Sequence, residues 1–135
     1  MAKGLEIRDA HFPGRAPIDA YGAGGFRFAD MSHRGSILCL PSGVHGWDVT
    51  APEAITQETL SAVFGEADAI EVLLIGMGEE FRRVPKDLQA ALREQGVVTD
   101  AMSTGSAVRT YNVLLAEERA VAAALIAVDD PGKRA

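Results

Sequence analysis

The order of apolar and polar positions changes character midway along the chain. In the first half, short apolar or alternating segments at residues 17–21, 26–28, 36–40 and 44–49 are separated by turns rich in glycine and proline. This pattern is typical of strands in close succession. In the second half, apolar residues recur three or four positions apart, as on the buried face of a helix. We therefore expect a strand-rich first half, followed by alternating strands and helices.

Two apolar runs in the second half are predicted to be parallel strands joined by a helix. The run at residues 70–75 ends in the glycine turn 76–78, and the run at residues 97–102 ends in a polar turn. Pro85 suits the first turn of the helix between them, and Gly96 its end. Because parallel strands end at the same edge of a sheet, both turns are expected at one edge, where open α/β sheets usually bind ligands.

Two more helices are expected beside this unit. Thr56 can cap a short helix that stops at Gly65. Ser103 or Thr104 can cap a longer helix, whose apolar positions recur at helical spacing.

The last part of the chain gives two conflicting signals. Residues 117–124 favour a helix by their alanine content, whereas residues 125–128 favour the end of a strand. Continuing the preceding helix through them would make it long for a domain of this size. We therefore predict a turn near Glu117 and a last strand from about Arg119.

Length and charge restrict the class of protein. The 135 residues, 47% of them hydrophobic, suffice for one domain with its own core. We expect an N-terminal arm at residues 1–15, the domain at residues 16–128 and a polar tail at residues 129–135. The net charge of −6 argues against general nucleic-acid binding, which needs a dense basic face.

Targeting and redox signals indicate a cytoplasmic protein. The charged start of the chain does not resemble a signal peptide. The longest apolar run, residues 120–128, is far shorter than the ~20 residues of a membrane helix. Cys39 is the single cysteine, so an intramolecular disulfide is excluded and a reducing compartment is expected.

The start of the helix near residue 104 is a candidate anion site. The first free N–H groups of a helix attract anions. Here Thr104, Gly105 and Ser106 would present theirs, and Arg109, one turn further along, could reach back over the ligand. An ordinary helix cap, with Arg109 in a structural ion pair, is the simpler explanation of the same residues.

Other motifs do not predict chemistry. Gly76 and Gly78 fit neither the dinucleotide nor the P-loop pattern, and the three histidines lack metal-ligand spacing. Cys39 lies in an apolar run and is expected to be an inert core thiol, although a nucleophilic pair with His33 or His45 is conceivable. We assign no catalytic, cofactor-binding or metal-binding residue and expect no cofactor.

The loop that follows the glycine turn is a candidate protein contact. It carries Phe81, Arg82 and Arg83, and an exposed aromatic side chain flanked by arginines is typical of binding surfaces. Packing of Phe81 against the neighbouring helix is an equally good explanation.

Six segments of the chain follow one family pattern in order: residues 18–22, 24–28, 33–36, 41–44, 71–76 and 109–115. Together they resemble the domain-of-unknown-function family that includes mitochondrial NADH:ubiquinone oxidoreductase (complex I) assembly factor 3. The resemblance extends over roughly residues 16–128. It implies a compact three-layer α/β domain with a central mixed sheet, in which the segment after the third helix is a strand antiparallel to the others.

The resemblance implies an assembly chaperone that acts through protein contacts, and it carries no catalytic residues. Residues that match the family pattern in the candidate cleft are Gly76, Gly78, Thr104, Arg109 and Asn112. We therefore expect a cytoplasmic, bacterial, non-enzymatic protein-binding or assembly accessory factor with an unidentified protein partner and no nucleic acid or membrane segment. The alternative is a small-anion or metabolite site, with or without enzymatic activity, at residues 104–106 with Arg109.

Overall fold

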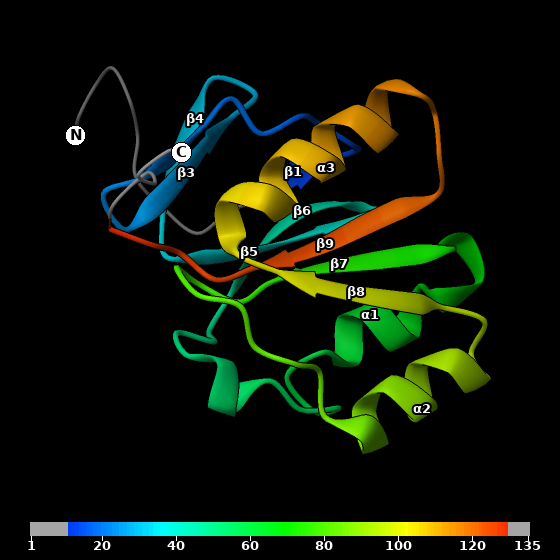
Figure 1. Ribbon diagram of the computed structural model, residues 1–135. Coiled ribbons are helices and arrows are strands. Elements are labelled where there is room, and N and C mark those ends of the chain that lie inside the picture. Colours follow the sequence, from blue (N-terminus) through cyan, green and yellow to red (C-terminus); the bar gives the residue numbers. More distant parts are fainter. Residues whose placement is uncertain (1–10, 130–135) are drawn as a thin grey trace.

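A six-stranded mixed sheet forms the centre of the computed structural model, which describes residues 11–129 (Figure 1). β7, β8 and β9 are parallel to one another, while β5, β6 and β1 pair antiparallel, and β9 joins the two halves by pairing with both β7 and β5. In spatial order the strands are β1 (His11–Pro13), β6 (Gly43–Trp47), β5 (Ser36–Leu40), β9 (Val121–Leu125), β7 (Val72–Gly76) and β8 (Val98–Met102).

Each face of this sheet is covered by a different layer. One face packs against α1 (Ser61–Gly65) and α2 (Lys86–Glu94), and the short 3-10 turns Pro52–Ala54 and Ala67–Ala69 belong to the same part of the chain. The opposite face packs against α3 (Thr104–Ala116) and a small antiparallel sheet (Figure 1). The strands of the small sheet are β2 (Ala20–Gly22), β3 (Gly25–Phe28) and β4 (Met31–Arg34).

The alternation of side chains along each central strand divides the core into two clusters. On β5, Leu38 and Leu40 face the α1–α2 layer, whereas Ile37 and Cys39 face α3 and the small sheet. All five side chains of β9 are buried in the same alternating way. Strands covered on both faces read as continuous apolar runs, which explains why the helical signal of residues 117–124 was misleading.

The main sequence predictions for the fold are confirmed. The parallel strand–helix–strand unit is β7, α2 and β8, and Pro85 and the positive-φ Gly96 flank α2 as expected. The last segment is strand β9. We expected this strand to be antiparallel to the others. That expectation is confirmed for its pairing with β5 and is wrong for its pairing with β7, which is parallel.

Three local features differ from the sequence predictions. The predicted cap Thr56 instead holds a hydrogen-bonded turn, with its Oγ1 accepting from Thr59 N at 3.1 Å, and α1 starts five residues later. Strand β4 was not predicted. Residues 11–13, assigned to the arm, form β1 on the edge of β6.

A single side chain of α3 fastens the segment that leads into the small sheet. Asn112 Nδ2 donates to Ile18 O, and Asn112 Oδ1 accepts from Ile18 N, both at 2.9 Å. Asn112 lies one turn beyond Arg109 along the helix. The side chain thus satisfies both backbone groups of one residue and fixes the position of β2 relative to α3.

Replacing Asn112 with alanine should lower the free energy of unfolding by about 1–3 kcal/mol, because two partly buried hydrogen bonds are lost. Urea unfolding measures this loss. Val113→Ala is the matched control on the same helix, since Val113 is 56% exposed and its truncation should change stability by less than about 0.5 kcal/mol. Equal stability of the two variants would show that Asn112 does not fasten this segment.

Candidate functional site

The structure brings the glycine turn after β7 together with the start of α3, as the sequence predicts. Thr104, the first residue of α3, is fully buried at this junction. Its Oγ1 accepts from Gly78 N at 3.0 Å and donates to Ile126 O at 2.6 Å, while its backbone N donates to Gly78 O at 2.8 Å. Thr104 therefore joins the segments that follow β7 and β9 to the start of α3.

Two glycines in the candidate cleft allow close packing. A Cβ atom on Gly76 would lie 2.9 Å from Thr104 Cα, and a Cβ atom on Gly105 would collide with Tyr21 Oη. Real Cβ atoms do not approach other atoms so closely. The absence of these two side chains thus lets the chain close over the sheet edge, with Tyr21 against the first turn of α3.

Two of the three predicted anion donors already have partners within the chain. Thr104 N donates to Gly78 O, and Ser106 N donates to Oγ of the cap residue Ser103 at 3.3 Å. The exposed Arg109 donates from Nη2 to Ser106 Oγ at 3.4 Å. The cap predicted at Ser103 is present. An anion site at this helix start stays a prediction, and two of its three N–H donors would first have to give up a protein acceptor.

The candidate contact loop lies next to this junction, beside an open hollow of about 370 Å³. Gly78, Glu79, Glu80 and Arg82 line the hollow on one side, and residues 126–129 line it on another. Arg82 Nη1 lies 3.2 Å from Glu53 Oε2, and a hydrogen bond from the backbone of Glu53, together with this ion pair, lowers the pKa of the Glu53 carboxyl group. The loop is therefore held at its start by the hydrogen bond from Gly78 to Thr104, and further along by the ion pair of Arg82 with Glu53.

Phe81 projects from this loop into solvent. Its side chain is 60% exposed, and Arg82 and Arg83 beside it are exposed as well. The nearby Val84 packs against the core cluster under α2. Of the two sequence interpretations for Phe81, the structure therefore shows the exposed one.

Cys39 lies on β5, and its side chain is in the core on the face of the sheet that packs against α3. Its thiol is buried, and this burial raises its pKa to about 12, although a hydrogen bond with Tyr111 acts in the opposite direction. Burial also raises the pKa of Tyr111. A protonated, enclosed thiol is a poor nucleophile.

A cluster of Ser42, His45 and Glu66 was missed by the sequence analysis. Ser42 Oγ donates to Glu66 Oε2 at 2.5 Å and lies 3.0 Å from His45 Nε2, and Ser42 N donates to Glu66 Oε1 at 2.9 Å. In a catalytic triad the histidine stands between the serine and the carboxylate. Here the serine stands between the other two, so the cluster fixes the β5–β6 turn and lacks the relay order of a hydrolase.

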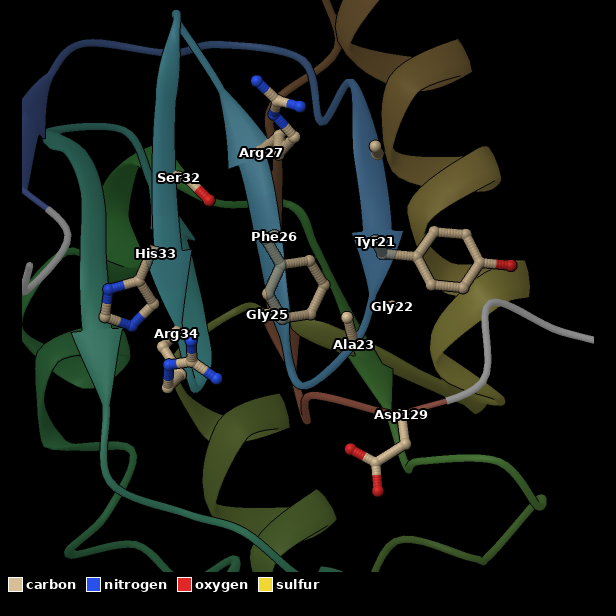
Figure 2. A pocket seen from close by; sticks show the side chains of 11 residues that line it. Tyr21, Gly22, Ala23, Gly25, Phe26, Arg27, Ser32, His33, Arg34 and Asp129 are labelled. Carbon is tan, nitrogen blue, oxygen red and sulfur yellow. The ribbon is translucent and has the colours of Figure 1, made fainter. Parts of the chain in front are cut away.

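A second hollow, of about 420 Å³, lies on the small sheet (Figure 2). Arg27 lies beside Ser32 at one end and Arg34 lies at the other, with Asp129 beyond the turn between β2 and β3 (Figure 2). This site could not be predicted from the sequence, because it depends on the register of β2, β3 and β4. The alternation of Phe26, Arg27 and Phe28 was its one visible sign.

Residues 126–129 line the 370 Å³ hollow, and the last of them also lines the 420 Å³ hollow. Ile126 N donates to Gly76 O at 3.0 Å, and Ala127 N donates to Ser36 Oγ at 2.9 Å. Further along, Val128 O and Asp129 O accept from the backbone of the turn between β2 and β3. Asp129 lines both hollows.

Among residues 11–129, no helix is both long and apolar enough to cross a bilayer. The same residues hold no group of three histidine, cysteine, aspartate or glutamate side chains placed to bind a metal ion.

The chain is a small three-layer α/β protein. Its six-stranded mixed sheet is covered on both faces, and Thr104 closes one edge of that sheet. Comparison with known proteins identifies its family. The chain belongs to the family described as protein of unknown function (DUF498/DUF598), whose model matches residues 18–126.

Relatives in this family include both bacterial and animal proteins. An uncharacterised protein of Rhodobacter capsulatus is 41% identical over 88% of this chain and 90% of its own length. The mouse protein NADH dehydrogenase (ubiquinone) 1 alpha subcomplex assembly factor 3 is 30% identical over 97% of this chain and 70% of its own length. The resemblance to the assembly-factor family, inferred from the six sequence segments, is confirmed.

A solved structure supports the fold. A crystal structure described as an outer membrane protein from Bartonella henselae is 66% identical and superimposes with a TM-score of 0.85, over 88% of this chain and all of that one. The three-layer mixed α/β architecture expected from the sequence is confirmed.

Thr104→Val should lower the free energy of unfolding by about 2–4 kcal/mol, because Gly78 N and Ile126 O each lose a buried partner. Thr104→Ser keeps the hydroxyl group and should cost only about 1 kcal/mol for one lost methyl group. Urea unfolding of both variants measures the difference. If serine and valine destabilise equally, the hydroxyl group does not hold this junction together.

Cys39 should react slowly with iodoacetamide in the folded protein at pH 8. Its pKa of about 12 keeps the thiolate fraction small, and burial blocks access. Mass spectrometry should show rapid labelling only after unfolding in urea, with glutathione as the exposed-thiol control. Rapid labelling of the native protein would support a thiol enzyme.

Proposed function

We propose that this protein is a non-enzymatic accessory factor that assists the assembly of other proteins by direct contact. The contact surface is the loop of residues 78–83, and the observation that carries the proposal is the exposed Phe81. Covering the 60% of the Phe81 side chain that is exposed would contribute about 1–2 kcal/mol, the matching share of a full phenylalanine burial. Aromatic and arginine side chains are also the residues that most often dominate binding energy.

The loop is suited to binding because part of it is already ordered. Its first residues are fastened at Gly78 by Thr104, and Arg82 is paired with Glu53. A loop that is fixed before binding loses less conformational entropy when a partner docks. Arg83 remains available to pair with an acidic side chain of the partner, and the adjoining hollow gives the partner a recess to fill.

The named relatives support the kind of partner that we propose. The mouse relative is an assembly factor of NADH dehydrogenase by name. We infer that this protein acts in the cytoplasm of a bacterium on a subunit or assembly protein of a respiratory membrane complex. The acidic net charge, −6, supports a protein partner over nucleic acid.

Replacing both Phe81 and Arg83 with alanine should reduce recovery of crosslinked partners at least tenfold without unfolding the protein. Loss of one buried aromatic group and one ion pair exceeds the 1.4 kcal/mol that corresponds to tenfold in affinity. Affinity capture from the native host with mild crosslinking, read by mass spectrometry, measures the recovery.

The matched control is Val113→Ala combined with Arg93→Ala, which also removes one exposed apolar side chain and one exposed arginine, but from α3 and α2. This control should recover partners as the parent protein does. Unchanged recovery by the folded Phe81/Arg83 variant would show that the loop is not the contact surface.

A further inference from the structure

The small sheet presents two faces of opposite character. Residues that pair across antiparallel strands share a face, and the register pairs Tyr21 with Phe26 and Phe26 with His33. Phe26 and His33 are buried, and Phe26 belongs to the core cluster under α3. This face therefore closes the core.

The opposite face forms the floor of the 420 Å³ hollow. The register pairs Ala20 with Arg27 and Arg27 with Ser32, and it pairs Gly22 with Gly25 and Gly25 with Arg34. Gly25 and Ser32 thus flank the diagonal between the two arginines, while Ala20 and Gly22 lie on the neighbouring strand β2. Because these four residues are small or lack side chains, they leave the floor of the hollow open beside Arg27 and Arg34.

Neither arginine forms an ion pair within residues 11–129, where the ion pairs join Arg82 to Glu53 and Arg119 to Glu71. Asp129 also lines the hollow, beside the β2–β3 turn, and is the acidic side chain that a bound anion would face. They occupy diagonal positions on adjacent strands, and the Cα atoms of such positions lie roughly 7–8 Å apart. Two long side chains that start this close together can both reach one anion bound between them.

We propose that this hollow binds a small organic dicarboxylate. The guanidinium group of arginine matches a carboxylate with two parallel hydrogen bonds, and two separated arginines match two carboxylates joined by a few carbon atoms better than one compact anion. The Ser32 hydroxyl group can donate a further hydrogen bond. The volume lies within the range of small-ligand pockets.

This site lies on the small sheet, apart from the Phe81 loop, so it extends the proposed function and does not depend on it. This anion site is also separate from the start of α3, where two of the backbone N–H groups already donate hydrogen bonds to protein acceptors. The two proposals fail independently, because one concerns recovery of proteins and the other concerns binding of a purified small molecule.

Titration of the purified full chain with succinate, followed by backbone amide NMR, tests the proposal. Succinate should shift the amides of Gly22, Gly25 and Ser32 with saturation, whereas acetate and sodium chloride at equal ionic strength should not. Arg27→Gln and Arg34→Gln should each weaken binding about tenfold, the loss expected for one hydrogen-bonded charge pair. Arg93→Gln, on α2, removes the same charge elsewhere and should leave binding unchanged.

Further variants separate recognition from simple attraction of charge. The double lysine variant, R27K/R34K, keeps both charges but loses the planar fork, so it should bind more weakly than the parent chain and more tightly than the double glutamine variant. Both arginines are exposed, so an unchanged amide spectrum away from the hollow confirms folding. Equal shifts by acetate and succinate, or saturable binding that survives R27Q/R34Q, would overturn the proposal. Tighter binding of a tetraglutamate peptide than of succinate would overturn it in favour of a protein-docking surface.

Discussion

The complete burial of β9 is the constraint on which the rest of the structure depends. This strand pairs with β7 on one side and β5 on the other, and thereby joins a parallel half of the sheet to an antiparallel half. Its three central residues are alanines with no exposed surface. Small side chains at the middle of the sheet let both layers approach closely, so that α3 and the small sheet on one face, and the α1–α2 layer on the other, share one strand as their common base.

At the sheet edge where α/β proteins commonly bind a ligand, protein groups fill the space between the glycine turn and the start of α3. The hydroxyl group of Thr104, the glycine at position 76 and the ring of Tyr21 close that edge from within. Features able to bind another molecule are therefore displaced to the periphery. They lie on the loop around Phe81 and on the outer face of the small sheet, where polar and charged side chains do not disturb the core.

Much of the fold could be predicted from the sequence, because the central strands and helices carry strong local signals. The apolar run of β5, the proline and glycine that flank α2, and the cap of α3 act over a few residues. Strand β4 escaped prediction because Ser32 and Arg34 face outward and Met31 is only partly buried, which leaves a weak alternation. Strand β1 is three residues long and is held by pairing with β6, which is distant in the sequence.

The sites were predicted less well than the helices and strands, because they depend on contacts between residues that are far apart in the sequence. The residues around Thr104 were placed correctly at one sheet edge, but their role depends on Gly78 and Ile126, which are 26 and 22 positions away. The pairing of Arg27 with Ser32 depends on a register that no local pattern specifies. Exposure of Phe81 was one of two equal interpretations, because packing of a loop side chain is decided by the three-dimensional structure.

The segment that follows β9 is hydrogen-bonded to four separate parts of the fold. Within residues 126–129, Ile126 N and Ala127 N donate hydrogen bonds, and Ile126 O, Val128 O and Asp129 O accept them, so that the segment is bonded to β7, β5, α3 and the β2–β3 turn. Local opening of this segment would break these bonds together, and the free energy of such an opening is shared by everything that borders it. Asp129, at the end of the segment, lines both hollows, so such an opening would remove a lining residue from each of them together.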